Sequence, residues 1–367
     1  MEQWSSGILE ECTLPDVIGY RLRVVCYLSC FFLVLLSPML NVALIGTGFI
    51  GSVHAANVAR HPETNLAAIH DVELSRLSQI AVQTGAKIAQ DVEQIFAAKD
   101  IDVVFIASST NTHIDYLRQA AQRGKAVYCE KPIGLNYQHA KEVVEFVGKS
   151  GVPATIGFNR RFDPNHAALR EEVNNGAVGK IEIIQMSSRG PKPPPLEYVV
   201  VSGGQMLDQA IHFFDLLRWI SNDEAEEIHA IGSALIDPRI AEVGDVDTAI
   251  VSIRMKGGEL CQIDCSRRTN YGYDERIEVF GSKGLIESRR QRSRGVSRYI
   301  GDKVVEDGLH PGWFERIKES YYEALSAFVD AINHRKTPSP SLEDGLKAQL
   351  LADKATESIK TGVPVKV

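Results

Sequence analysis

The feature that most constrains this chain is the sequence GTGFIG at residues 46–51, which directly follows a continuously apolar run. Such a run is typical of a strand that is buried on both faces of a parallel sheet. In this context Gly46 makes the tight turn, Gly48 lets backbone amides approach a pyrophosphate, and Gly51 lets a helix pack on the strand. The helix then begins at Phe49 and Ile50, and its unpaired amides and partial positive charge face the phosphates.

An acidic residue at the right distance supports a dinucleotide site. Asp71 ends the second expected strand, 20 residues after Gly51. A carboxylate there accepts hydrogen bonds from both hydroxyls of the adenosine ribose. It would repel the 2′-phosphate of NADP, and the next residue is Val72 rather than an arginine. The sequence therefore predicts NAD as the cofactor, and a glycine turn that served packing alone would not explain Asp71.

The first half of the chain alternates apolar strands with amphipathic helices, which predicts a doubly wound parallel sheet, an α/β fold. We assign residues 39–158 to this Rossmann domain. The expected strands are 41–46, 66–71, 102–108, 126–130 and 153–158, and the expected helices are 49–60, 75–85, 92–98, 112–123 and 139–149.

Beyond residue 158 the pattern changes to short alternating strands with few helices between them. This predicts a substrate-binding and oligomerisation domain of the α+β type over residues 159–340, with a large, mostly antiparallel open sheet. A C-terminal helix and tail follow at 341–367. The expected strands are 181–188, 227–234, 248–255, 259–265, 278–281 and 284–287, and the helices are 165–174, 204–220 and 342–361.

Residues 1–38 are an atypical extension. The apolar stretch 24–40 follows Arg21 and Arg23, as in a signal peptide or a membrane anchor, but Ser37-Pro38 interrupts it before the length that a membrane span needs. Pro38 also disfavours cleavage after Ser37. We favour Met39 as the biological start, the extension as an artefact of the gene model and a cytoplasmic location. Membrane anchoring or organelle targeting is the alternative if residues 1–38 are real.

Composition and isolated motifs exclude several other functions. The net charge of −7 is not that of a dedicated nucleic-acid-binding protein. The pair Cys261 and Cys265 has no second ligand pair, so we expect no metal site. The basic run at residues 289–294 is better explained as a solvated strand edge or a subunit contact than as a phosphate site.

Two segments far apart in sequence carry residues suited to catalysis. Glu130-Lys131-Pro132 lies at the carboxyl end of an expected parallel strand, where α/β proteins collect their ligands. A lysine beside a bound nicotinamide can donate to a substrate oxygen and stabilise it as hydride leaves the carbon. The alternative is that Lys131 has no catalytic role and is a lysine at a strand end that points into solvent.

The second segment begins an expected helix at residues 204–220. Asp208 and His212 are four residues apart, so a regular helix would place them on one face. In that arrangement Asp208 orients the imidazole, and His212 takes a proton from a substrate hydroxyl. The alternative is that the two residues meet by chance, with Asp208 an acidic residue at the start of a helix and His212 a histidine at the edge of the core.

Together these motifs resemble the Gfo/Idh/MocA oxidoreductase family, and the resemblance runs from about residue 40 to the C-terminus. Residues 196–219 and 265–282 are similar to those of the inositol 2-dehydrogenases within it. The resemblance implies an NAD-dependent dehydrogenase of the CH–OH group of a polyol, assembled as a homotetramer through its open sheet. It implies no nucleic-acid partner, and the catalytic positions fall on Lys131, Asp208 and His212.

The resemblance also implies the remaining site residues. The nicotinamide side of the cofactor is lined by Ser108, Thr110, Asn111, His113 and Glu130, and substrate hydroxyls are bound by Asn159, Arg160, Arg161, Tyr271 and Tyr273. The expected reaction is oxidation of myo-inositol to 2-keto-myo-inositol. Oxidation of scyllo-inositol or another sugar, and a regulatory protein that binds the dinucleotide without turnover, remain as alternatives.

Overall fold

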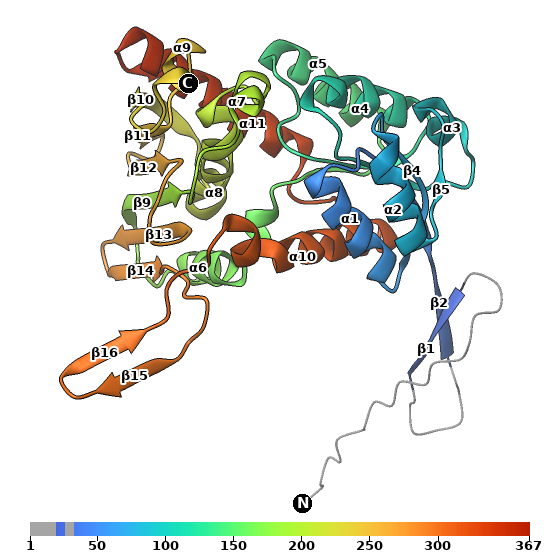
Figure 1. The fold of residues 1–367 in the computed structure, drawn as a ribbon, viewed down its shortest axis with the longest axis horizontal. Coiled ribbons are helices and arrows are strands. Elements are labelled where there is room, and N and C mark those ends of the chain that lie inside the picture. The colour runs from blue at the N-terminus through green and yellow to red at the C-terminus, as the bar shows by residue number, and fades with distance from the viewer. Residues whose placement is uncertain (1–19, 26–32) are drawn as a thin grey trace, which may run out of the picture.

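The computed structural model describes residues 20–25 and 33–367, and they form two layered sheet domains with two small hairpins (Figure 1). Part of the N-terminal extension forms one hairpin, in which β1 (Tyr20–Val25) pairs antiparallel with β2 (Leu33–Pro38). Our preference for a start at Met39 concerns all of residues 1–38, of which 1–19 and 26–32 lie outside the described residues, and it stays a prediction. No helix in the described parts of the chain is long and apolar enough to cross a membrane.

The first domain is a parallel sheet with helices on both faces. Its strand order is β5-β4-β3-β6-β7-β8, so the chain reverses direction across the sheet between β3 and β6. Ligands of doubly wound sheets collect at this switch point, outside the carboxyl ends of the strands. The strands are β3 (Leu40–Ile45), β4 (Thr64–His70), β5 (Lys87–Ile88), β6 (Val103–Ile106), β7 (Ala126–Cys129) and β8 (Ala154–Ile156).

The helices of this domain follow the expected alternation. They are α1 (Phe49–Arg60), α2 (Leu74–Thr84), α3 (Val92–Ala97), the short 3₁₀ helix η1 (Thr110–Thr112), α4 (His113–Gln122) and α5 (Tyr137–Ser150). Strands β3, β6 and β7 are buried along almost their whole length, because helices cover both of their faces. This confirms the predicted Rossmann fold.

The second domain is built on a seven-stranded sheet with the order β14-β13-β9-β12-β11-β10-β17. All neighbours are antiparallel except β9 and β12, so the sheet is mixed but mostly antiparallel, as predicted. The strands are β9 (Ile181–Arg189), β10 (Ala225–Ser233), β11 (Thr248–Met255), β12 (Leu260–Ser266), β13 (Asp274–Gly281), β14 (Gly284–Ser288) and β17 (Val365–Lys366).

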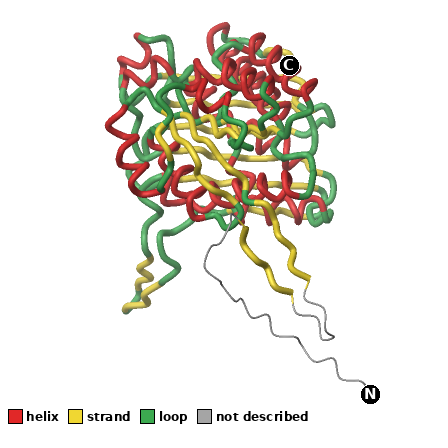
Figure 2. The backbone as a smooth tube through the Cα atoms, turned by 90° about the vertical axis from the view of Figure 1, so that its right-hand side faces the viewer, coloured by secondary structure: helices red, strands yellow, loops and turns green. Residues whose placement is uncertain are grey.

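Helices cover only one face of this sheet, as Figure 1 shows, and Figure 2 views the molecule from the side of the parallel sheet. The helical elements after β8 are η2 (Asn159–Phe162), α6 (Pro164–Asn174), α7 (Leu196–Val201), the π-helical turn η3 (Met206–Ala210), α8 (Ile211–Ser221), α9 (Pro238–Glu242), α10 (Trp313–Asn333) and α11 (Leu342–Thr361). Beyond β14 a hairpin of β15 (Ser297–Ile300) and β16 (Lys303–Glu306) projects from the domain.

Helix α10 is the largest element that we did not predict. It packs on the first domain, because Leu325, Phe328 and Val329 join the core cluster that contains Leu44 and Phe105, and it also contacts η2 of the second domain. Its apolar positions recur at helical spacing, so the signal was present in the sequence. The long helix therefore runs back from the second domain to the parallel sheet (Figure 1).

Candidate active site

The glycine turn has the geometry that a pyrophosphate requires. Gly46 has φ +93°, and a Cβ there would lie 2.4 Å from the carbonyl oxygen of Ala107, so the turn and its contact with the loop after β6 need glycine. A Cβ on Gly51 would lie 2.0 Å from the carbonyl oxygen of Gly46, so glycine also lets α1 pack on the strand. A Cβ on Gly48, in contrast, would meet no atom within 4 Å. This open position at the start of α1 fits the close approach of a phosphate.

Asp71 stands at the other edge of this turn. Its carboxylate accepts a hydrogen bond from the Thr47 hydroxyl at 2.8 Å and from the backbone amide of Glu73 at 2.9 Å. Burial raises the pKa of this carboxyl, but the amides of Glu73 and Thr47 outweigh it and hold the pKa below the ordinary value. Asp71 is therefore an anion, as ribose recognition requires.

A cavity of about 560 Å³ adjoins this turn and carries one cation that the sequence reasoning overlooked. Thr47 and Gly48 line the cavity together with Arg76 and Gln79 of α2. The charge of Arg76 contributes to the lowered pKa of Asp71, so the guanidinium lies in its neighbourhood. Phe49, which also lines the cavity, packs edge-on against Trp313 and Phe314 at the start of α10, with ring centroids 5.7 and 5.0 Å apart.

Lys131 follows β7 and reaches the second domain. Its amine donates to the backbone oxygen of Asp208 at 2.9 Å and to the Asp208 carboxylate at 3.3 Å. The backbone amide of Lys131 donates to the carboxylate of Glu130, which also lies 2.8 Å from the imidazole Nε2 of His54 on α1. Lys131 is thus held between the two domains, at the carboxyl edge of the parallel sheet.

The predicted pairing of Asp208 with His212 is wrong. The Asp208 carboxylate accepts from Lys131, from the hydroxyl of Tyr198 at 3.0 Å and from the guanidinium of Arg267 at 3.2 Å, and no bond joins it to His212. The physical reason lies in the tertiary contacts. Two cations that other segments bring to the π-helical turn Met206–Ala210, Lys131 and Arg267, bind the carboxylate in place of the imidazole.

His212 nevertheless belongs to the same site. Burial lowers its pKa well below the ordinary value, and the charges of Arg160 and Lys131 lower it further, so the ring lies within electrostatic range of both cations. The imidazole packs edge-on against Phe158 at a centroid distance of 5.9 Å. Its Nδ1 atom is buried and has no hydrogen-bond partner among the described residues. A neutral imidazole beside a cationic amine can accept a proton from a substrate hydroxyl.

Four of the residues expected beside the nicotinamide lie between β6 and the first residue of α4, and the fifth, Glu130, follows β7. Thr110 is half-buried, Asn111 is exposed, and the hydroxyl of Ser108 lies 2.7 Å from that of Thr112. His113 is buried, with its ring nitrogens 2.8 and 3.0 Å from the carbonyl oxygens of Pro132 and Ser108. The ring of His113 therefore braces this loop against the turn that carries Lys131.

The three residues of η2 that we expected to bind substrate are buried and already have protein partners. Asn159 donates to the Ser320 hydroxyl at 2.8 Å, and Arg160 donates to Glu275 at 3.0 Å. Arg161 bridges Asp215 of α8 and Asp344 of α11. Two carboxylates of the protein thus already pair with the guanidinium of Arg161, and its role in substrate binding stays a prediction. Arg160 remains a neighbour of His212.

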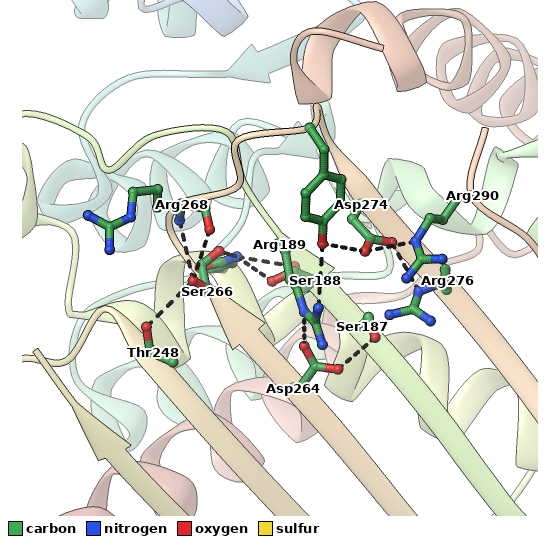
Figure 3. A network of polar contacts seen from close by, with 12 residues as sticks. Ser187, Ser188, Arg189, Thr248, Asp264, Ser266, Arg268, Asp274, Arg276 and Arg290 are labelled. Carbon is green, nitrogen blue, oxygen red and sulfur yellow. Dashed lines mark hydrogen bonds and ion pairs between the residues drawn. The ribbon is translucent and has the colours of Figure 1, made fainter. Parts of the chain in front are cut away.

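The two tyrosines separate onto opposite faces of the open sheet. Tyr273 is buried on the helix-covered side, where its hydroxyl donates to Glu275 at 2.6 Å and accepts from Arg160 at 3.2 Å. Tyr271 instead donates to Asp274 at 2.9 Å, within the outer-face network of Arg189, Asp264, Asp274, Arg276 and Arg290 (Figure 3). The structure therefore does not bring Tyr271 together with Lys131.

Sequence reasoning missed two residues of the site. Tyr198 of α7 and Arg267, which follows β12, both donate to Asp208. Neither falls in a motif with a spacing rule, and the only signal was the tyrosine and arginine content of the two segments that resemble inositol 2-dehydrogenases. In the parts of the chain that the structure describes, no group of three or more acidic, cysteine or histidine side chains could hold a metal ion.

Comparisons with known proteins agree with this geometry. Residues 40–158 match the model of an oxidoreductase family with an NAD-binding Rossmann fold, and residues 166–287 match the GFO/IDH/MocA C-terminal domain. The chain belongs to the Gfo/Idh/MocA family. It is therefore an NAD-dependent dehydrogenase, and the open turn at Gly48 and the Asp71 carboxylate are the features of this chain that suit NAD.

Three proteins illustrate the similarity. A myo-inositol 2-dehydrogenase of Thermotoga maritima is 41% identical over 331 residues, which cover 89% of this chain and 98% of the relative. A scyllo-inositol 2-dehydrogenase (NAD(+)) of Bacillus subtilis is 31% identical and covers 89% and 95%, respectively. The crystal structure of a probable dehydrogenase from Thermotoga maritima superposes with a TM-score of 0.87, at 41% identity over 89% of this chain and 98% of that one.

Proposed function

We propose that this enzyme oxidises one ring hydroxyl of myo-inositol to the ketone, giving 2-keto-myo-inositol. The observation that carries the proposal is the convergence of Lys131 with Asp208 and the neighbouring His212, from two domains, at the carboxyl edge of the NAD-binding sheet. The 41% identical relative named as a myo-inositol 2-dehydrogenase supports the choice of substrate.

The roles follow from charge and protonation. NAD, when bound, accepts the hydride that leaves the carbinol carbon. His212 is the general base, because its lowered pKa keeps the ring neutral and able to take the hydroxyl proton. Lys131 donates to the same oxygen and stabilises its developing negative charge. Asp208 holds the lysine amine in place, a role that replaces the predicted contact with His212.

The experiment is NAD reduction across myo-inositol, scyllo-inositol, glucose and galactose, with the full chain and its His212→Ala variant. Loss of a general base typically costs about 10² to 10⁴-fold in rate. We expect kcat/KM to be highest for myo-inositol and to fall by that factor in the variant. Near-normal turnover by His212→Ala would overturn the role of the imidazole, and a wild-type preference for glucose or galactose would overturn the substrate.

Scyllo-inositol is the second candidate, and the 31% identical relative that carries this name favours it. The two inositols differ in the orientation of one ring hydroxyl, so the same panel separates them. A regulatory protein that binds the dinucleotide without turnover is the less favoured alternative, because both Lys131 and His212 are present. It predicts NAD binding with no NADH formation on any substrate of the panel.

We also infer that the enzyme is a homo-oligomer, a tetramer by resemblance, which assembles through the outer face of the open sheet. The helix-free face of that sheet exposes Ile183, Ile250, Leu260 and Phe280. Apolar side chains gathered on one face are typical of a protein contact. Light scattering of the full chain and of an Ile250→Asp variant tests this, and a monomeric wild type would contradict it.

A further inference from the structure

Arg267 is a buried cation with an unusual set of partners. Its side chain is only 5% exposed, and its one ion pair is with Asp208, at 3.2 Å from Nη1 to Oδ2. The Nε and Nη2 atoms are buried without any hydrogen-bond partner in the described residues. A buried ion pair is weak evidence for stability, and one with unpaired donors is weaker still.

Buried arginines elsewhere in the chain have one or two carboxylate partners. Arg316 of α10 pairs with Asp163 alone and, like Arg267, leaves its Nε and Nη2 atoms without a partner in the described residues. Arg161 bridges Asp215 and Asp344, and Arg218 bridges Glu224 and Asp344. Each of them is matched by two carboxylates. Arg267, in contrast, has to share a single carboxylate with Lys131 and Tyr198. What distinguishes Arg267 is therefore its partner rather than its unpaired donors, because the carboxylate that it binds also binds the amine of Lys131.

The charges at this carboxylate do not cancel. Lys131 and Arg267 each bring one positive charge, and Asp208 brings one negative charge. Burial raises the pKa of Asp208, but the charges of Lys131 and Arg267 and the Tyr198 hydrogen bond more than offset this and keep the carboxyl ionised. Without Arg267, the amine of Lys131 and the carboxylate would form a neutral pair. With it, the cluster keeps one net positive charge.

We propose that Arg267 is a positioning residue for hydride transfer, which engages Asp208 so that Lys131 remains free to stabilise the negative charge on the substrate oxygen. The inference rests on the proposed role of Lys131. Arg267 itself acts through Asp208 and need not touch the substrate. Its effect belongs to the step in which charge develops, since a preorganised cation contributes most in the transition state.

The matched control is the adjacent arginine. Arg268 is exposed, its side chain has no hydrogen bond or ion pair, and it points away from the network drawn in Figure 3. Arg268→Ala removes the same charge from the same loop. We expect it to leave kcat, KM and the melting temperature at their wild-type values.

The test compares Arg267→Ala, Arg267→Lys and Arg268→Ala in the full-length enzyme. NAD affinity is measured by fluorescence titration. The values of kcat and KM are measured with myo-inositol, or with another substrate of the panel if that one is turned over faster. For Arg267→Ala we expect kcat to fall by about 10 to 10²-fold, somewhat less than the loss of a direct oxyanion donor. NAD affinity and substrate KM should change little, and Arg267→Lys should recover most of kcat because it restores the charge.

A double-mutant cycle shows whether the effect passes through Asp208. In an Asp208→Asn background, Arg267→Ala should cost much less than it does in the wild type, because coupled residues are not additive. Wild-type kcat in Arg267→Ala, or an equal loss in both backgrounds, would overturn the proposal. If Arg267→Ala does not fold, Arg267→Lys and Arg267→Gln decide by the same criteria, with Lys active and Gln impaired. The proposed function fails separately, if Lys131→Ala retains full kcat.

Discussion

The amine of Lys131 donates both to the backbone oxygen and to the carboxylate of Asp208, a residue 77 positions further along the chain. These two bonds fix the lysine that follows β7 of the parallel sheet to the π-helical turn η3 of the second domain. The carboxylate that the lysine meets is shared with Tyr198 and Arg267. The amine for which we propose a catalytic role is thus positioned by the contact between the domains, and several measurements can test what this contact does.

Replacing Lys131 with alanine should lower kcat with the best polyol substrate. Removal of one preorganised donor to a developing oxyanion typically costs about 10² to 10³-fold. The dissociation constant of NAD should stay near the wild-type value, because the glycine turn and Asp71 are unchanged. Steady-state kinetics and a fluorescence titration check the two expectations. An unchanged kcat would instead mean that the lysine only points into solvent and takes no part in the reaction.

The pH profile of kcat/KM should show a general base with an unusually low pKa. Burial and the charges of Arg160 and Lys131 lower the pKa of His212 well below 6.5. The imidazole therefore stays neutral at pH values where an ordinary histidine is protonated, and kcat/KM should begin to fall only well below pH 6.5. An acid limb of kcat/KM at 6.5 or above, not shifted by His212→Ala, would contradict this assignment.

The same shift has a consequence for stability. A histidine whose pKa is lower in the folded than in the unfolded state binds its proton more readily when unfolded. Its contribution to the free energy of unfolding is present above pH 6.5 and is lost as the pH falls from 6.5 toward the lowered folded value. Urea denaturation at several pH values should show a smaller acid loss of stability for His212→Ala than for the wild type.

The glycine turn offers a matched pair of substitutions. Gly48 has φ −61° and an open position for a Cβ, so Gly48→Ala should fold with a wild-type melting temperature. The added methyl group occupies the space that a phosphate would need, so NAD affinity should fall. Gly46→Ala instead meets the backbone of Ala107 at a positive φ and should destabilise the fold itself. A Gly48→Ala variant with unchanged NAD affinity would contradict the placement of the pyrophosphate.

Arg161 should matter for folding rather than for substrate binding. Arg161→Met leaves Asp215 buried without its main partner, and breaking a buried ion pair typically costs about 3 to 5 kcal/mol. The free energy of unfolding, measured in urea, should fall by this amount. The KM of the folded variant should remain at the wild-type value, whereas a residue that bound the substrate hydroxyls would raise KM.

Much of the fold was predictable because its signals are local. The apolar run before Gly46 and the strand–helix alternation predicted the parallel sheet, and the bounds of α1, β11 and α11 were predicted to the residue. The amphipathic pattern of α10 was present but was not recognised, and its packing on the first domain could not follow from a pattern in one segment. Which core an apolar face joins depends on the path of the whole chain.

By itself the sequence determined the dinucleotide turn, the acid at its edge and the strand end from which Lys131 emerges, because each depends on residues that are neighbours in the chain. Only the tertiary structure decided what Asp208 and Arg161 bind. Buried charges are paired by whichever segments the folded domains bring within bonding distance, and the spacing of residues along one helix does not record which segments these are.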